Sequence, residues 1–302
     1  MKYLLLYNPV SGRTNFKQHI STIQKIFSKT EHTLDVYESK RANDLIKVSY
    51  DKASSYDVFL VAGGDGTLNE VLNGIMKSEI RPHIGLLPSG TANDTAAILG
   101  INKNIKRSLK IYMNEKPNKM DINMINDQYF IYTAASGILT RVSYDVSRRH
   151  IKKYGYLAYV IRAMQDFAHD YKYPITIKTN DKEITCECVM VLGLSSNRVG
   201  GMRLYNFSDS RLNDGFFELR LFTRTKSFWR FRLLSSFLRG GKKLREDLHL
   251  VSDHFEIKTN PDVDWNADGE FATKGNITIK VVKEAISIFA SKKVVKKAFN
   301  SR

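Results

Sequence analysis

The chain has 302 residues, of which 42% are hydrophobic and 26% are charged, a balance that is typical of folded soluble proteins and excludes wholesale disorder. No stretch approaches the roughly 18 to 20 uninterrupted apolar residues of a membrane-spanning helix, and the apolar run after Met1 is too short for a signal peptide. We therefore expect a cytoplasmic protein. The two cysteines, Cys186 and Cys188, lie two positions apart on a predicted strand and face the same side, which excludes a disulfide framework.

The chain is strongly basic, because 47 Lys and Arg residues stand against 31 Asp and Glu residues and give a net charge of +16. Such an excess raises the local concentration of anions at the surface. Nucleic acid, an anionic membrane surface or a phosphorylated ligand would each suit this charge, and a generally basic soluble surface is the alternative. The sequence contains no HExxH motif and no CxxC spacing, which argues against a zinc site.

In the first third of the chain, strand-like and helix-like segments alternate. Short apolar runs predict strands, and apolar residues three or four positions apart predict helices. This alternation predicts an α/β domain with a parallel sheet flanked by helices on both faces. The predicted strands are 3–7, 33–37, 58–61 and 84–87, and the predicted helices are 16–28, 44–53, 67–76 and 95–99.

After about residue 120, strand signals dominate, with helical patterns only at about 155–168 and 227–238. They predict a second domain that is mostly antiparallel and β-sandwich-like, with inserted helices. We place the first domain at 1–121 together with the basic C-terminal tail, about 289–302, and the second domain at 122–288. The predicted strands of the second domain are 129–133, 175–178, 189–194, 216–222, 255–258 and 277–281.

Three strands of the first domain end in polar, turn-rich loops, at residues 8–12, 63–67 and 88–94. The carboxyl ends of parallel strands lie at one edge of the sheet, where such sheets bind ligands. Glycines let the backbone approach an anion closely, and the N-terminus of a following helix attracts negative charge. Residues 64–70 are therefore a candidate phosphate cradle, although tight turns and helix caps remain the alternative interpretation. Side-chain donors for the same site are Thr67, Asn69, Thr91, Asn8 and Ser11.

Five motifs, spread in order over nearly the whole chain, resemble those of the diacylglycerol kinase catalytic superfamily. The stretch VAGGDGTLNE at 61–70 resembles its GGDGT signature, and LPSGTAND at 87–94 resembles the PxGTxND motif of the lipid kinases. NPVSG at 8–12, KMD at 119–121 and NADGE at 266–270 resemble the other three. The superfamily includes sphingosine, ceramide and bacterial lipid kinases and, more distantly, NAD kinases and 6-phosphofructokinases. The chain is most similar to the soluble bacterial diacylglycerol kinases of the DgkB type.

The resemblance implies an ATP-dependent lipid kinase that converts diacylglycerol, or a related lipid, to phosphatidic acid in a cleft between a nucleotide-binding first domain and a lipid-binding second domain. By matching motif positions, it also implies which residues bind the nucleotide. These residues are Asn8, Pro9, Val10, Ser11, Gly12, Gly64, Asp65, Gly66, Thr67, Leu68, Asn69, Glu70 and Thr91. Ser39, which lies outside the five motifs, is also expected to bind the nucleotide.

Phosphoryl transfer from ATP also requires magnesium, which prefers oxygen ligands and usually keeps several waters. Asp65, Asp94 and Asp121 match motif positions and are the candidates for a catalytic Mg²⁺, directly or through water, with Asp65 also a catalytic residue. The NDG sequence that ends at Gly215 is an ordinary turn signal. In the relatives this turn resembles a structural magnesium site, which here would use the Asp214 side chain. The backbone carbonyls of that site would come from Arg211 and Phe216; Asn213 stands where relatives have a further acid, so whether the site is kept is open.

A lipid hydroxyl has a high pKa and reacts faster when a positioned carboxylate accepts its proton. Glu270 follows a tight Ala-Asp-Gly turn that could project its carboxylate, and the resemblance gives the matching glutamate the role of base. The alternative is an exposed hairpin glutamate. Glu284 lies in no motif and is given no role.

The segment 220–245 offers a route to a substrate that resides in a membrane. It contains nine basic residues and no acidic ones, and interleaved aromatic residues of this kind are typical of interfacial segments. A second basic cluster lies at 148–153. We expect peripheral, reversible binding to the inner face of the cell membrane, although a packed helix with solvated arginines is the alternative. The aromatic residues are Phe222, Phe228, Trp229, Phe231 and Phe237.

Three other functions are weighed against the lipid kinase. An NAD kinase would need no lipid, and a nucleic-acid-binding protein would bind DNA with a steep salt dependence, but no nucleic-acid motif is present. A catalytically silent regulator is disfavoured because all the candidate acids are retained. The sequence does not reveal which lipid is phosphorylated or the oligomeric state, for which a homodimer is open.

Overall fold

The computed structural model describes residues 1–12, 16–138, 172–207, 211–223, 233, 235–237 and 239–299. The chain divides into two compact units. Unit 1 comprises Met1–Ile122, Leu212–Asp214 and Lys283–Arg302, and unit 2 comprises Asn123–Arg211 and Gly215–Val282. The chain passes from one unit to the other within two strands, β5 (Asn118–Ile125) and β17 (Ile277–Ile288), and again on either side of Leu212–Asp214.

Unit 1 contains a parallel sheet in the order β4-β3-β1-β2. Every residue of β3 is buried, as expected for a strand that is covered on both faces. At the outer edge of β4, the end of β17 adds a further parallel pairing between Ile288 and Ile84. The parallel sheet predicted from the sequence is confirmed. Its strands are β1 (Lys2–Tyr7), β2 (Thr33–Glu38), β3 (Val58–Gly63) and β4 (His83–Pro88).

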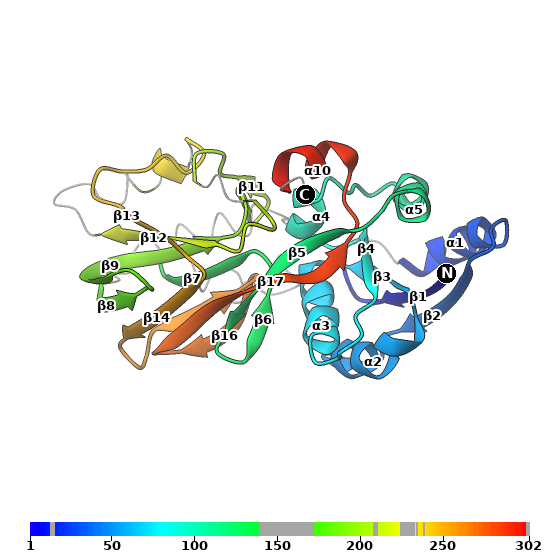
Figure 1. Cartoon of the computed structure of the whole chain (residues 1–302), viewed down its shortest axis with the longest axis horizontal. Helices are drawn as coiled ribbons and strands as arrows, with labels where there is room; N and C mark the ends of the chain where they lie inside the picture. Colours follow the sequence, from blue (N-terminus) through cyan, green and yellow to red (C-terminus); the bar gives the residue numbers. More distant parts are fainter. Residues whose placement is uncertain are drawn as a thin grey trace. The chain divides into compact units, whose positions relative to one another are not determined.

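Helices cover both faces of this sheet, with α2 and α3 packed together on one side and α1 and α5 on the other (Figure 1). The predicted first helix differs at its start, because a 3-10 turn, Phe16–His19, precedes α1. Helix α5 was not predicted, although the Asn104 side chain caps it by accepting a hydrogen bond from the Arg107 N–H at 3.1 Å. The helices are α1 (Ile20–Phe27), α2 (Asp44–Lys52), α3 (Asp65–Ile75), α4 (Asp94–Ile98), α5 (Ile105–Asn114) and α10 (Lys292–Ala298), with a second 3-10 turn at Ala53–Ser55.

Unit 2 is built mainly of antiparallel strands, as predicted. Its longest strands are β9 (Glu183–Leu194) and β17, and β9 pairs with β7 and β8 along one edge and with β12 along the other. The two helical segments predicted at 155–168 and 227–238 lie wholly or largely outside the described residues. The other strands are β6 (Gln128–Phe130), β7 (Thr133–Gly137), β8 (Tyr173–Lys178), β10 (Arg198–Val199), β11 (Met202–Arg203), β12 (Phe217–Thr223), β13 (Leu248–Ser252), β14 (His254–Thr259), β15 (Asp264–Ala267) and β16 (Glu270–Lys274).

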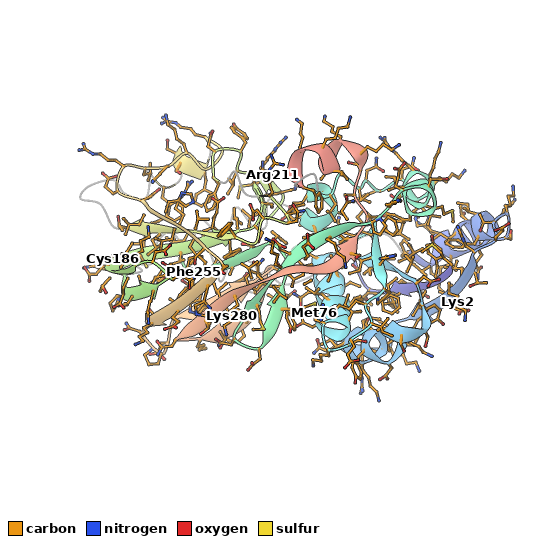
Figure 2. The ribbon with its side chains drawn as sticks, viewed as in Figure 1. Lys2, Met76, Cys186, Arg211, Phe255 and Lys280 are labelled. Carbon is orange, nitrogen blue, oxygen red and sulfur yellow. The ribbon has the colours of Figure 1, made fainter. Side chains whose placement is uncertain are left out.

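The core of unit 2 is rich in aromatic side chains. Phe217 contacts Phe130 and Phe255 in edge-to-face geometry, with ring centroids 5.5 and 6.5 Å apart. Phe255, labelled in Figure 2, is fully buried between the strands. Cys186 and Cys188 are both free thiols, as the sequence predicts, and burial raises the pKa of the Cys188 thiol to about 12.

One predicted strand of unit 2 is interrupted. The apolar run 129–133 was expected to form a single strand, but β6 ends at Phe130 and β7 begins at Thr133. Between them, the N–H groups of Ile131 and Tyr132 donate to the carboxylate of Asp268 instead of to a neighbouring strand. A buried side chain from far along the chain therefore overrides the local strand propensity.

Within the part of the chain that the structure describes, no helix has the length and apolar character needed to cross a lipid bilayer.

Candidate active site

The three predicted loops come together at the carboxyl ends of the strands of unit 1. The N–H of Asn8 donates to the Ala62 carbonyl at 3.2 Å, which ties the end of β1 to the end of β3. The N–H groups of Ser89 and Gly90 donate to the Gly63 carbonyl at 3.0 and 3.2 Å, which ties the third loop to the second. The parallel sheet thus brings loops 8–12, 63–67 and 88–94 into direct contact.

Glycines allow this close approach. A Cβ atom on Gly90 would lie 2.5 Å from the Gly64 Cα atom, too close for any side chain to be accommodated. Gly12 has φ +75°, and a Cβ there would overlap the carbonyl oxygen of Ser89. Ser11 completes the contact, because its hydroxyl oxygen would lie 3.6 Å from a Cβ on Gly64. The glycines are therefore explained first by the packing of one loop against another.

Helix α3 begins at Asp65, within the second predicted loop and two residues earlier than the sequence predicted. Its N-cap residue is Gly64, which has no side chain to cap the first-turn N–H groups. Thr67 is buried, whereas Thr91 in the third loop and Val10 in the first are exposed. Ser39 follows β2 and donates its N–H to the Tyr7 carbonyl at 2.9 Å, so it also lies at this edge of the sheet. Helix N-termini favour anions, and the phosphate cradle predicted at residues 64–70 stays a prediction.

The third loop does not offer a free helix N-terminus. The carboxylate of Asp65 accepts hydrogen bonds from the N–H groups of Asp94 and Thr95, both at 3.0 Å, and so caps α4. Burial, the larger effect, raises the pKa of Asp65, and the neighbouring Asp94 carboxylate acts in the same direction. Only the turn residues of this loop are therefore available to contact a phosphate. The Asn93 side chain fixes this turn, because it accepts a hydrogen bond from the Gly90 N–H at 2.8 Å and donates one to the Gly90 carbonyl at 2.7 Å.

Glu70 is engaged in the same way. Its carboxylate accepts a hydrogen bond from the N–H of Leu45 at 3.3 Å, at the start of α2. Burial, the largest effect, raises the pKa of Glu70. Glu70 therefore joins α3 to α2, a role that the sequence motif alone did not reveal.

Asp121 lies in β5 and is buried. Its carboxylate accepts a hydrogen bond from the N–H of Glu284 at 2.7 Å, and Glu284 has the unusual φ of +51°. The N–H of Asp121 donates to the Leu212 carbonyl at 2.8 Å, which links this acid to the turn that contains Asp214. Asp65 and Asp94 are neighbours, but the structure groups no three acidic, histidine or cysteine residues as a metal cage anywhere in its described ranges.

The proposed structural metal turn has the shape that its sequence predicts. Gly215 has φ +84°, a conformation that other residues rarely adopt. Phe216 is 48% exposed, and Arg211 is also exposed. One carboxylate and two carbonyls are a donor set of the oxygen type that magnesium prefers, if water completes the shell. Residues 208–210, which precede this turn, lie outside the described residues.

Glu270 stands at the tip of a tight hairpin in unit 2. Strands β15 and β16 pair with Ala267 opposite Glu270, so only Asp268 and Gly269 form the turn. Both have positive φ, +49° and +91°, as a type I′ turn requires. The side chain of Asn266 accepts a hydrogen bond from the Gly269 N–H at 3.0 Å and braces this turn. Glu270, the first residue of β16, is exposed.

Asp268 is a site residue that the sequence analysis missed. It is 5% exposed, and its carboxylate accepts three backbone N–H groups, from Ile131 at 2.6 Å, Tyr132 at 3.0 Å and Thr133 at 3.3 Å. These bonds fasten the hairpin tip to the start of β7. The only sequence signal was its position in the NADGE motif, between Asn266 and Glu270.

The start of the segment proposed to contact a membrane is buried. Arg220 and Phe222 are each 2% exposed, and Phe222 stacks on Phe237 with ring centroids 5.8 Å apart. Neither residue can reach a bilayer, because both belong to the interior of unit 2, so this part of the prediction is wrong. Phe228, Trp229 and Phe231, as well as the second basic cluster at 148–153, lie outside the described residues.

Comparison with known proteins identifies the family. Residues 2–125 match the family model described as the diacylglycerol kinase catalytic domain. A diacylglycerol kinase of Bacillus subtilis is 31% identical over 272 residues, which cover 88% of this chain and 89% of the relative. The diacylglycerol kinase of Staphylococcus saprophyticus is 28% identical over 288 residues, or 94% of each chain.

The fold is shared with a solved structure. A crystal structure of a Bacillus anthracis protein assigned as a diacylglycerol kinase superimposes with a TM-score of 0.84 over 97% of this chain and 96% of that one, at 22% identity. The five motifs, their positions on this fold and the full-length similarity agree with one another. The chain therefore belongs to the diacylglycerol kinase family and is a lipid kinase.

Proposed function

We propose that this lipid kinase is ATP-dependent and transfers the γ-phosphoryl group of ATP to the free hydroxyl of diacylglycerol, releasing ADP and phosphatidic acid. One observation carries the proposal beyond the family. Three glycine-bearing loops converge at one sheet edge in unit 1, where the uncapped N-terminus of α3 begins. A triphosphate suits such a site, because backbone N–H groups and the helix dipole both favour negative charge.

In this proposal, the first-turn N–H groups of α3 bind the phosphates, and Thr67 and Thr91 add hydroxyl groups. The loop 8–12 and Ser39 hold the remainder of the nucleotide, because they flank the same edge at the ends of β1 and β2. Gly64 and Gly66 keep the backbone free of side chains where the phosphates approach. Asp65 and Glu70 contribute by fixing α4 and α2 around the loop.

Magnesium fits the acids of unit 1 only with water or phosphate oxygens in its shell. Both oxygens of Asp65 already accept N–H groups, and Asp121 accepts the Glu284 N–H, so these carboxylates would bind through water. Asp94 is fully buried beside Asp65. When bound, the metal would neutralise charge on the phosphates. Asp214, with the carbonyls of Arg211 and Phe216, would hold a second, structural Mg²⁺.

Glu270 is the proposed general base. Its carboxylate would accept the proton of the lipid hydroxyl while the hydroxyl oxygen forms a bond to the γ-phosphorus and the bond from that phosphorus to the bridging oxygen of ADP breaks. Asp268 and Asn266 act as positioning residues, because they fix the hairpin that carries Glu270. The proposal requires Glu270 of unit 2 to reach the triphosphate held by unit 1, in an interdomain cleft. It also assigns nucleotide binding to the first domain and lipid binding to the second.

The lipid substrate resides in a bilayer, so we also propose peripheral and reversible association with the anionic inner face of the cell membrane. The net charge of +16 supports this proposal. The expected result is vesicle binding that weakens as salt rises. Equal binding to neutral vesicles at high salt would contradict it.

The direct test is an incubation with γ-labelled ATP, magnesium and a panel of acceptors in mixed micelles. The panel contains diacylglycerol, ceramide, sphingosine and, without detergent, NAD. Label in phosphatidic acid is the expected result. Label in NAD, or in none of the lipids, would contradict the proposed activity.

A further inference from the structure

Two neighbouring loops of unit 2 carry six positive charges and no negative charge. The segments 198–207 and 239–245 together contain seventeen residues, and none of them is Asp or Glu. Five of the six cations are exposed: Arg203, Arg239, Lys242, Lys243 and Arg245. The sixth, Arg198, is half-buried. Of the two acids that directly follow the second segment, Asp247 is buried and Glu246 is half-buried.

Hydrogen bonds hold the two loops side by side. The N–H of Asn206 donates to the Gly240 carbonyl at 2.8 Å, and its side-chain amide donates to the Arg239 carbonyl at 2.9 Å. The ring of Tyr205 packs on Gly240, because a Cβ there would lie 2.7 Å from it. The cations of both loops therefore belong to one surface.

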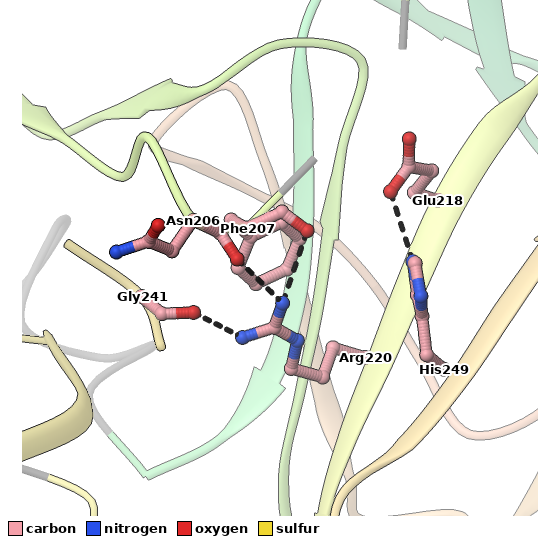
Figure 3. A network of polar contacts seen from close by, with 6 residues as sticks. All are labelled: Asn206, Phe207, Glu218, Arg220, Gly241 and His249. Atoms are coloured by element: carbon pink, nitrogen blue, oxygen red, sulfur yellow. Dashed lines mark hydrogen bonds and ion pairs between the residues drawn. The ribbon is translucent and has the colours of Figure 1, made fainter. Parts of the chain in front are cut away.

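The guanidinium group of Arg220 lies beneath this surface and fixes both loops (Figure 3). It donates to the carbonyl of Gly241 in one loop and to those of Phe207 at 3.0 Å and Asn206 at 3.3 Å in the other. It also lies over the Phe207 ring, 4.1 Å from the centroid. These hydrogen bonds fix the backbone of both loops, so the exposed residues of the loops are held in place before any partner binds.

Apolar side chains project from the same loops. Tyr205 is 60% exposed and Met202 is 38% exposed, whereas Leu204 and Phe207 between and beside them are buried. Burial of Leu204 and Phe207 anchors the loop and directs the other two side chains outward. A cationic surface with exposed apolar side chains suits a bilayer, in which anionic headgroups lie above acyl chains. A nucleic acid would use the charges but not the exposed methionine.

We propose that these two loops form the surface by which the protein docks on an anionic lipid bilayer. The surface consists of Met202, Arg203, Tyr205, Arg239, Lys242, Lys243 and Arg245, supported by Arg220. The inference rests on the proposed function, because a kinase for a bilayer lipid needs such a surface. It keeps residues 239–245, the end of the segment 220–245 that the sequence analysis named, adds the loop 198–207, and leaves Arg220 and Phe222 in the interior.

The test measures binding to vesicles by sedimentation at low and at physiological salt. The vesicles contain phosphatidylcholine with or without about one third phosphatidylglycerol. The variant is Lys242→Glu with Lys243→Glu. Its control is Lys106→Glu with Lys110→Glu, which makes the same charge change at exposed positions on α5. We expect the first variant to bind anionic vesicles at least about tenfold more weakly, because each cation near an anionic leaflet contributes roughly fivefold. The control should change binding much less.

The apolar part is tested separately with Tyr205→Ser, and Tyr50→Ser on α2 is its control because Tyr50 is 51% exposed. Weaker binding by the first alone, by severalfold, is expected. Phosphorylation of a short-chain, water-soluble diacylglycerol should remain unchanged in all four variants, which separates docking from catalysis.

Three results would overturn the proposal: equal losses in variant and control, no loss in either, or loss of activity on the soluble substrate. Tighter binding of wild-type protein to a short DNA duplex than to vesicles, abolished by the lysine changes, would also overturn it. If the wild type phosphorylates no diacylglycerol, the proposed function fails. The vesicle-binding comparison would still show whether these two loops dock on an anionic bilayer.

Discussion

At the residue scale, several acids of the candidate site serve the backbone rather than a ligand. The carboxylates of Asp65, Glu70 and Asp268 each accept N–H groups from segments distant in sequence. Such charge-assisted hydrogen bonds contribute about 1.5–3 kcal/mol each to stability, and removing one partner leaves a buried polar group unsatisfied. These three acids of the family motifs therefore stabilise the backbone around Glu270 and around the candidate phosphate-binding loops.

Replacing Asp268 with Asn should loosen the β15–β16 hairpin that carries Glu270. One carboxylate oxygen becomes an amide N–H₂ that faces a backbone donor, so at least one of the three N–H bonds is lost. We expect a loss of about 1–3 kcal/mol in the free energy of unfolding, measured by urea denaturation, together with a lower rate of phosphate transfer. Asp262→Asn, at an exposed position just before β15, is the matched control. A stable variant with full activity would show that the hairpin needs no such anchor.

Removing the Asp65 side chain should affect both stability and catalysis. Asp65→Ala leaves the N–H groups of Asp94 and Thr95 without their acceptor at the start of α4. The expected cost is about 1–3 kcal/mol, seen as a lower denaturation midpoint, with phosphate transfer strongly reduced. Asp51→Ala, on the exposed face of α2, should change neither quantity. An unchanged midpoint in Asp65→Ala would contradict the capping role.

At the scale of elements, the sequence predicts those strands, turns and helices that a local residue pattern determines. Three strands of unit 1, β1, β3 and β4, are apolar runs that stop at Asn8, Gly63 and Pro88, and their parallel pairing fixes the edge at which the loops meet. The tight turn before Glu270 was predicted from its Asp-Gly signal, but the strands β15 and β16 on either side of it were not. Helix α5 was missed despite its Asn104 cap. The break between β6 and β7 could not be predicted, because its cause, Asp268, lies more than 130 residues away.

The loop that ends at Asp247 provides a pH test at this scale. Asp247 is buried, and its carboxylate accepts a hydrogen bond from the Leu244 N–H at 3.0 Å. Burial, the largest effect, raises the pKa of Asp247. The charges of Arg220 and Lys243 lower this pKa, and the charge of Glu246 raises it. The unfolded carboxyl has a pKa of about 3.9. Because the folded pKa is higher, the folded state binds the proton more tightly, and this contribution to stability is lost as pH rises through the folded pKa.

Asp247→Asn keeps an acceptor for the Leu244 N–H and removes the titration. Its free energy of unfolding relative to wild type should therefore rise between about pH 4 and pH 7, as measured by urea denaturation at both values. The control is Asp262→Asn, for which the free energy of unfolding relative to wild type is compared at the same two pH values. A relative stability that falls over this range would contradict the assigned direction of the Asp247 shift.

At the scale of the whole molecule, the proposed reaction is divided between two units. Unit 1 supplies the three loops and the acids Asp65, Asp94 and Asp121, and unit 2 supplies Glu270 and the surface proposed to dock on a bilayer. The chain crosses between the units four times: within β5, within β17 and on either side of Leu212–Asp214. The Asp121 N–H bonds the carbonyl of Leu212, so the predicted metal turn is tied to a candidate site acid.

The most direct test of this division is the rate at which label passes from γ-labelled ATP to diacylglycerol, measured for wild type and Glu270→Gln, with ATP affinity determined on the same samples. Glu270→Gln should bind ATP as wild type does and transfer phosphate about 10²–10⁴ times more slowly, because it lacks a proton acceptor. Transfer at the wild-type rate, or weakened ATP binding with normal turnover, would contradict the account.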